Sequence, residues 1–259
     1  MKTLHYTFAT QNTFSAPVRE HQFVLHCTPR AGEGQTLLQA TLTTQPDAPL
    51  LLQPDGFGNT AAWGTLMAPH TCLHYAAMGV VQVDHTRAAA PCGALGLYRH
   101  PGARSVPGPL LRNLYAALRP ALVGGALQQG AVLCYAVRER LCYVPGATDT
   151  ATTAEQALAL GQGVCQDNTQ VFVALARLAG LPARYCMGLT VGQGATHAWP
   201  ELYANGVWHG FDPTRGCEVD ETYLRFAAGR DAADCPVERG VFLGVCSQMQ
   251  MVQMQVVEG

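Results

Sequence analysis

Residues 161–184 read GQGVCQDNTQVFVALARLAGLPAR. Two glycines precede an apolar stripe at helical spacing, which predicts a helix over residues 165–179. Gly180 and Pro182 follow the stripe and are typical of a helix end. Cys165 therefore occupies the first turn of this helix, where the helix dipole and the free N–H groups favour a thiolate over a thiol.

Cys165 is one of ten cysteines in the chain. No two of them are spaced as CxxC, so the sequence does not predict a zinc ribbon or a thioredoxin-type motif. No other cysteine opens a predicted helix directly after glycines. Because a lone cysteine at a helix start is more often a buried core thiol, the interpretation of Cys165 as a nucleophile depends on its partners.

Candidate partners follow in residues 197–214, which read HAWPELYANGVWHGFDPT. Asn205-Gly206 between β-prone residues is typical of a two-residue type I′ hairpin turn. A tight turn at this point puts His197 and Asp212 on the same face of the hairpin as a diagonal pair. Two such side chains lie within reach of each other.

Cys165, His197 and Asp212 together predict a Cys-His-Asp catalytic triad. In such a triad the histidine takes the thiol proton, and the carboxylate fixes the tautomer of the histidine and stabilises its protonated ring. Taken singly, a strand histidine is more often structural, and an aspartate before proline is more often a turn residue. His209 points to the opposite face of the hairpin and is not expected to be catalytic.

The rest of the chain predicts an α+β fold. Short alternating runs rich in Val, Leu and Thr predict an antiparallel sheet or sandwich over roughly residues 1–90, with strands at 4–9, 22–29, 36–43 and 72–83. Helical spacing follows at 110–118 and 126–141, and later strand patterns cover 185–191, 197–204, 207–211 and 241–257.

A change of composition suggests two domains. Residues 86–109 are rich in Ala, Gly and Pro and predict a linker. We therefore expect an N-terminal β-sandwich-like domain over residues 1–100 and a catalytic domain over residues 101–259.

The composition argues against several classes of protein. The chain has 259 residues, a net charge of −2 and only 13% charged residues, against about 25% in an average soluble protein. No basic patch suggests nucleic acid, and neither a signal peptide nor an apolar run of about 18 residues suggests a membrane. We expect a cytoplasmic protein without a cofactor, and no calcium loop of the DxDxDG kind is present.

Four blocks of sequence carry a family resemblance: Gly161-Gln-Gly-Val-Cys165-Gln-Asp167, Gly180-Leu-Pro-Ala-Arg184, His197-Ala-Trp199-Pro-Glu201 and Trp208-His-Gly-Phe-Asp212-Pro-Thr214. In order and spacing they resemble the bacterial transglutaminase-like superfamily over roughly residues 125–215. The resemblance implies a papain-like α+β core in which the nucleophilic cysteine opens the central helix and the other two triad members lie on adjacent strands. Residues 55–59, 69–70 and 229–232 also resemble, more weakly, one bacterial branch that carries a β domain before the core.

The resemblance also names candidate substrate-binding residues. Asp167 matches a family position, although an acid in the first turn of a helix is an equally good explanation. Trp199 and Trp208 are candidates for lining the cleft, and core packing explains them equally well. Residues 166–169 read QDNT where relatives often carry an aromatic residue and an alanine, which affects the shape of the cleft.

The second donor to an oxyanion is not identified by any motif. Gln129 and Tyr135, on the predicted helix before the cysteine, are the candidates that the sequence offers.

The motifs predict acyl transfer from a peptide or protein amide through a thioester. We expect water as the acceptor, which makes a peptidase or amidase, because no calcium loop is present and the bacterial relatives that it resembles are often peptidase-like. An amine acceptor would make a protein-glutamine transglutaminase. The alternatives are a non-catalytic binding module of the same fold and a metal site built from Cys165, His197 and Asp212, which no second closely spaced ligand pair supports. Neither the physiological substrate nor the oligomeric state follows from the motifs.

Overall fold

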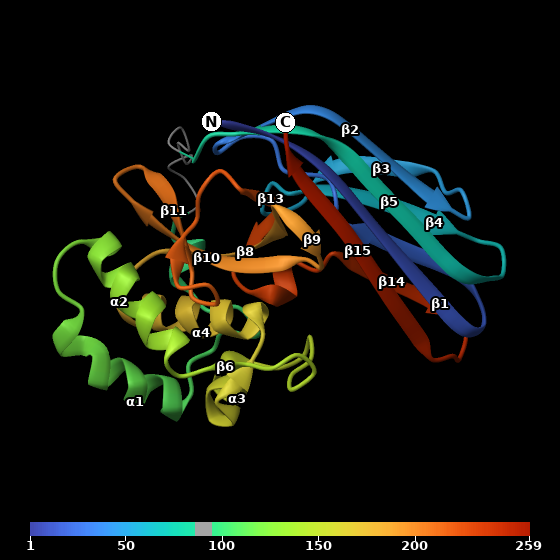
Figure 1. The fold of residues 1–259 in the computed structure, drawn as a ribbon. Helices are drawn as coiled ribbons and strands as arrows, with labels where there is room; N and C mark the ends of the chain where they lie inside the picture. Colours follow the sequence, from blue (N-terminus) through green and yellow to red (C-terminus); the bar gives the residue numbers. More distant parts are fainter. Residues whose placement is uncertain (86–94) are drawn as a thin grey trace.

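The computed structural model describes residues 1–85 and 95–259. Residues 86–94, the first part of the predicted linker, lie outside the described residues. Figure 1 shows two parts that pack against each other, a broad sheet of long strands and a smaller sheet with helices beside it. The fold is α+β, as the sequence predicts.

The larger sheet is antiparallel, and its main path runs in the order β2-β5-β1-β15-β9. β4 and β14 pair with the second half of β1, and β3 pairs with β4. The strands of this sheet are β1 (Lys2–Leu25), β2 (Gln35–Gln45), β3 (Leu50–Pro54), β4 (Thr60–Leu66), β5 (His70–Val83), β9 (Gly192–Gly194), β14 (Glu238–Leu243) and β15 (Gln248–Glu258).

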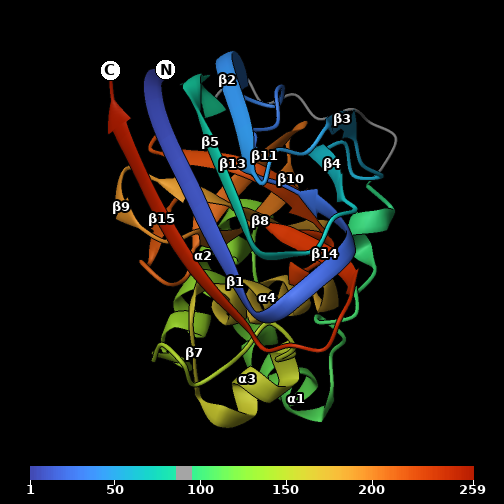
Figure 2. The ribbon, with the colours of Figure 1, turned by 90° about the vertical axis from the view of Figure 1, so that its right-hand side faces the viewer.

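β1 is one continuous strand where the sequence predicts two. Its pairing with β5 shifts register between Thr13 and Val18, and its pairing with β14 shifts between Arg19 and Gln22. Glu20, at the second shift, has a φ of 51°. Because such irregularities bend a strand, β1 turns a corner and joins both halves of the sheet (Figure 2).

The C-terminal segment returns to the N-terminal sheet. β15 pairs with β1 from Phe14↔Gln248 to Leu4↔Glu258, so the two ends of the chain lie side by side (Figures 1 and 2). The predicted strand-like tail is therefore two strands, and both complete a sheet that the first residues of the chain begin. The boundaries 1–100 and 101–259 stay a prediction.

The smaller sheet has the order β12-β11-β10-β8-β13, and helices pack against it. The helix at its centre, α4, is buried at every position from residue 167 to 177. The remaining elements are η2 (Leu97–Arg99), α1 (Pro109–Leu118), η3 (Arg119–Ala121), α2 (Ala126–Arg138), β6 (Cys142–Tyr143), α3 (Ala154–Leu160), β7 (Gln162–Gly163), α4 (Cys165–Leu178), β8 (Ala183–Thr190), β10 (His197–Ala204), β11 (Val207–Asp212), β12 (Cys217–Glu218), β13 (Tyr223–Gly229) and η4 (Ala232–Asp234).

The predicted hairpin is confirmed in register and in turn type. Ala204 pairs with Val207, and the pairing continues outward from that point without a slip. Asn205 and Gly206 have φ values of 54° and 87°, and a type I′ turn requires positive φ at both positions.

Four buried charges join the two parts of the molecule. Glu201 on β10 accepts hydrogen bonds from Arg184 on β8, at 2.7 Å, and from Arg225 on β13, at 2.9 Å. The same two arginines contact Glu33 of the N-terminal part, at 2.7 and 3.2 Å. Burial alone would raise the pKa of Glu201, but the two guanidinium groups outweigh burial and hold this pKa well below its usual range.

In the described residues, no helix combines the length and the apolar character needed to cross a membrane.

Removing one charge from this network should destabilise the protein strongly. Glu201→Gln leaves two buried guanidinium groups short of a counter-charge, so the free energy of unfolding should fall by about 3 kcal/mol in urea titration. Glu258→Gln is the matched control, because Glu258 pairs with Lys2 at the surface, and its loss should leave the free energy of unfolding almost unchanged. Equal effects of the two substitutions would contradict the assignment of a stabilising network.

Candidate active site

Cys165 is the first residue of α4, and the segment before it is held by a short parallel pair. Tyr143 on β6 pairs with Gly163 on β7, two residues before the cysteine. A Cβ atom at Gly163 would lie 2.6 Å from the Cβ of Asp167, so this approach requires a glycine. The thiol is free and half-buried.

Asp167 closes the first turn of α4. Its Oδ2 accepts hydrogen bonds from the Val164 backbone N–H, at 2.8 Å, and from the Thr148 hydroxyl, at 2.7 Å. The side chain is fully buried, and burial raises its pKa. Asp167 thus caps the helix that presents Cys165, which is the first-turn role that the sequence left open beside a catalytic one.

His197 and Asp212 form the diagonal pair that the hairpin register predicts. The Nε2 atom of His197 lies 2.7 Å from Oδ2 of Asp212. Asp212 is fully buried, and its Oδ1 also accepts the backbone N–H groups of Thr214 and Arg215, at 2.9 and 3.0 Å. With its Nε2 on the carboxylate, the ring has Nδ1 left for another partner.

Tyr223 is a fourth donor to this carboxylate, and no sequence motif points to it. Its hydroxyl donates to Oδ2 of Asp212 at 2.8 Å. Burial would raise the pKa of Asp212, but the hydrogen bonds from His197, Tyr223 and the backbone outweigh burial and lower it. Asp212 is therefore a fixed, ionised partner for the imidazole.

The electrostatics of His197 depend on both of its neighbours. Burial lowers the pKa of its imidazole, but hydrogen bonds to Asp212 and Cys165, and the charges of these two groups, raise it to about 9. An imidazole with this pKa is protonated at neutral pH. The structure thus joins His197 to Asp212 by a hydrogen bond and places Cys165 and His197 in the lining of one cleft.

The two tryptophans lie in the core. Trp199 is fully buried, its ring is stacked on His197 with centroids 6.4 Å apart, and its Nε1 donates to Glu201 at 3.2 Å. Trp208 packs edge-on against Tyr98 and under the guanidinium of Arg184. Neither tryptophan lines the cleft that holds Cys165, so the structure gives packing roles to both.

The two candidates for a second oxyanion donor lie away from this cleft. The Gln129 side chain donates to the Gly124 carbonyl at 3.0 Å. Tyr135 is 67% exposed and borders a different hollow, together with Cys217 and Glu218. His209 borders a third hollow, beside Trp208, as expected from its face of the hairpin.

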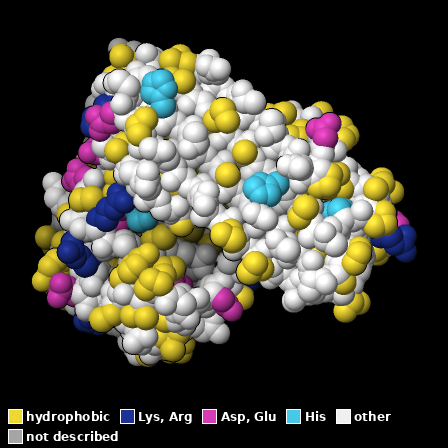
Figure 3. Space-filling view, turned by 45° about the vertical axis from the view of Figure 1, so that its right-hand side comes forward, with side chains coloured by type: hydrophobic (Ala, Val, Ile, Leu, Met, Phe, Trp, Pro, Cys, Tyr) yellow, Lys and Arg dark blue, Asp and Glu magenta, His cyan; other side chains and the backbone are white. Residues whose placement is uncertain are grey.

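A cleft of about 420 Å³ contains Cys165 and His197. This volume is within the range of small-molecule and peptide side-chain pockets. The space-filling view shows the molecule hollowed between its two lobes (Figure 3). One wall belongs to the core, including Tyr143, Gln166 and Tyr185, and the other belongs to the large sheet and the segment that leads into it, including Tyr75, Glu238 and Gln250. Tyr143 brings a phenolic hydroxyl into the cleft, and no motif in the sequence singles it out.

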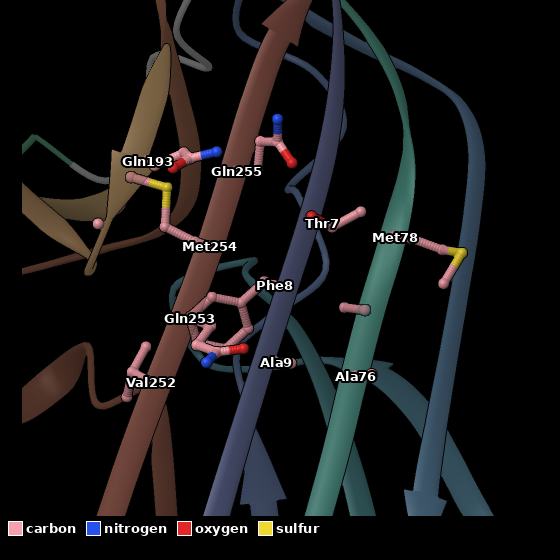
Figure 4. Close-up of a pocket in the computed structure, with 12 residues that line it drawn as sticks. Thr7, Phe8, Ala9, Ala76, Met78, Gln193, Val252, Gln253, Met254 and Gln255 are labelled. Atoms are coloured by element: carbon pink, nitrogen blue, oxygen red, sulfur yellow. The ribbon is translucent and has the colours of Figure 1, made fainter.

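A further hollow lies over β1, β5 and β15 and does not qualify as a catalytic site. Its lining includes Thr7, Ala76, Gln253 and Gln255 (Figure 4). None of the described residues that border it is a cysteine, a histidine or a charged residue. Within residues 1–85 and 95–259, no group of three or more His, Cys, Asp and Glu side chains is arranged to hold a metal ion.

The pKa of His197 can be measured by NMR titration of its imidazole resonances. We expect a value near 9 in the native protein. Asp212→Asn should lower this pKa by about one unit or more, because the substitution removes the adjacent negative charge. Glu218→Gln removes a carboxylate outside the contacts of His197 and is the control, so equal shifts in both variants would contradict the assigned pairing.

Comparison with known proteins agrees with this architecture. Residues 124–213 match the family described as the transglutaminase-like superfamily, and residues 4–82 match the bacterial transglutaminase-like N-terminal region. The chain is 27% identical to an uncharacterised protein of Mycobacterium leprae over 94% of this chain and 93% of the relative. It is also 27% identical to one of Mycobacterium tuberculosis, over 83% of this chain and 79% of the relative.

A solved structure shares the whole fold. The crystal structure of a "Putative Cysteine Protease" from Cytophaga hutchinsonii superposes with a TM-score of 0.83 at 20% identity, over 99% of this chain and 90% of that chain. The large sheet and the helical core therefore occur together, in this arrangement, in a second protein. The chain is thus similar to the transglutaminase-like superfamily over its core and to the bacterial transglutaminase-like N-terminal region over its first sheet.

Proposed function

We propose that the protein is a cysteine-dependent enzyme that cleaves amide bonds through a thioester, with Cys165, His197 and Asp212 as its catalytic triad. The observation that carries this proposal is the position of His197, which contacts the thiol on one side and an ionised, fully buried carboxylate on the other. A merely structural histidine does not need both partners. The C. hutchinsonii protein of the same fold, described as a "Putative Cysteine Protease", supports the same class of reaction.

The first half of the reaction forms the acyl-enzyme. The thiolate sulfur of Cys165 attacks the amide carbonyl carbon, and the oxyanion that forms lies at the start of α4, where backbone N–H groups are free to stabilise it. The C–N bond then breaks, and the imidazolium of His197 gives its proton to the departing amine. The products of this half are a thioester on Cys165, a free amine and a neutral His197.

The second half releases the acyl group. His197 takes a proton from a water molecule, whose oxygen attacks the thioester carbonyl carbon. The C–S bond breaks, a carboxylic acid leaves, and the thiolate–imidazolium pair is restored. The same steps with an amine as the nucleophile produce a new amide, so peptidase and transglutaminase activities differ only in the acceptor.

Selective alkylation tests the nucleophile. We expect iodoacetamide to modify Cys165 far faster than the other nine thiols near about pH 6, where ordinary thiols are almost wholly protonated. Peptide mass spectrometry measures each site in one sample. His197→Ala should abolish the advantage, and His209→Ala, a histidine outside the cleft, should keep it. If Cys165 alkylates no faster than the exposed Cys142 and Cys217 of the same sample, the proposal fails.

The pH dependence of turnover tests the acid. Because His197 has to donate its proton to the leaving amine and its pKa of about 9 is that of the free protein, kcat/KM should fall as the pH rises through about 9. A panel of peptidyl amides, with and without a primary amine as acceptor, provides the assay and separates hydrolysis from amide formation. Asp212→Asn should lower kcat by roughly 100-fold or more, since the histidine loses both its orientation and its counter-charge. A variant that retains full kcat would remove Asp212 from the triad.

A further inference from the structure

The wall of the cleft that faces the core carries one charge. Glu238 is the first residue of β14 and lines the cleft with Tyr75 of β5 and Gln250 of β15. Among the described residues that border the cleft, it is the only carboxylate, and no lysine or arginine accompanies it. His197, on the opposite wall, can carry a positive charge, and the Asp212 carboxylate already pairs with it.

Only neutral groups contact the Glu238 carboxylate. The side-chain amides of Asn12 and Gln250 donate to its Oε2, the second at 3.4 Å, and the Tyr75 phenol lines the cleft with it. In residues 1–85 and 95–259, no Lys, Arg or His nitrogen forms an ion pair with it. Burial raises the pKa of this carboxyl, and the neutral donors offset only part of that effect.

Holding the strands together does not require a charge at this position. A glutamine side chain would accept the same hydrogen bond from Asn12 and would avoid the cost of desolvating a carboxylate. Asn12 itself is fully buried in β1, and its Oδ1 has no hydrogen-bond partner. An uncompensated carboxylate that lines the same cleft as the candidate nucleophile, beside an unpaired polar atom, is typical of a binding site.

Building on the proposed function, we propose that Glu238 is a specificity-determining residue that binds a primary ammonium group of the amide substrate while Cys165 attacks its carbonyl. The ammonium supplies the counter-charge that the protein does not. A compact ammonium fits better than a guanidinium, because a bidentate fork needs both carboxylate oxygens and the amides of Asn12 and Gln250 already donate to Oε2. The ammonium is either the α-amine of a peptide or a side-chain amine such as that of lysine.

Charged thiol reagents test this site without turnover. Methanesulfinate leaves when the thiolate of Cys165 attacks an alkyl methanethiosulfonate, and a mixed disulfide forms. Rates with aminoalkyl, uncharged alkyl and sulfonatoalkyl reagents are measured by peptide mass spectrometry and divided by their rates with 2-mercaptoethanol. Aminoalkyl reagents with a short and a long chain are both used, so that one of them spans the cleft from the thiol to Glu238.

We expect the native protein to prefer a cationic reagent over the anionic one. With Asp212 ionised, a thiolate–imidazolium pair leaves the triad with a net charge of −1, so the contribution of Glu238 is read from the change of this preference in its variants. Glu238→Gln should reduce the cationic-to-neutral rate ratio by roughly three- to tenfold. Glu238→Asp, which keeps the charge, should retain the preference. Asp149→Asn, which removes an exposed carboxylate beside the cleft residue Thr150, should change the ratio less than about twofold.

A ratio that is equal in Glu238→Gln and in the native protein would overturn the proposal. If Glu238→Gln does not fold, the absence of a cationic preference in the native protein overturns the proposal equally. The thiosulfonate measurement needs no amide cleavage. Failure of the catalytic proposal is therefore seen separately, in the iodoacetamide experiment, where Cys165 would react at the rate of an ordinary thiol.

Fluorogenic amides then distinguish the two sources of the ammonium. Alanyl amides with a free and with an acetylated amino group test the α-amine, and acetylated peptidyl amides with lysine or norleucine test the side-chain amine. In one of the two pairs, the cationic substrate should have a higher kcat/KM than the neutral substrate. Glu238→Gln should remove this difference. Equal kcat/KM values in both pairs would overturn the assignment of a substrate ammonium.

Discussion

The hydrogen bond between His197 and Asp212 is the constraint on which the candidate site depends. It links two strands of one hairpin, and the Asn205-Gly206 turn sets the register that makes the bond possible. Two backbone N–H groups and a tyrosine hydroxyl hold the carboxylate from other directions, so the carboxylate cannot follow the ring if the ring moves. The ring is therefore oriented toward Cys165 by a carboxylate that is itself fixed.

Local patterns predicted the parts of the site that local geometry determines. The start of α4 at Cys165 follows from its glycines and its apolar stripe, and the diagonal pair follows from a two-residue turn. Tyr223 could not be found in this way, because β13 reaches the site by pairing with β8 rather than with the hairpin. The pairing of β14 and β15 with the first strand could not be predicted either, because pairing partners more than two hundred residues apart leave no periodic signal in the sequence.

Burial explains why the candidates around the triad were ambiguous in the sequence. Trp199 and Trp208 share the hairpin face of His197 and Asp212, but Trp199 donates to Glu201 and Trp208 packs under Arg184, which keeps both in the core. Asp167 is equally close to the nucleophile, yet its oxygen serves the Val164 N–H that the helix start leaves without a partner. Residue type and spacing are the same for a core tryptophan and a cleft tryptophan, so only the three-dimensional arrangement separates them.

The two walls of the cleft impose opposite demands on its electrostatics. A thiolate needs nearby positive charge, which the core supplies through His197 and the first turn of α4. A carboxylate on the facing wall opposes that thiolate, and its own desolvation opposes folding. Both costs disappear when a cation occupies the space between the walls. In the proposed reaction, the carboxylate on the side of the large sheet would therefore select among amide substrates, whereas the triad would act on any amide bond that reaches it.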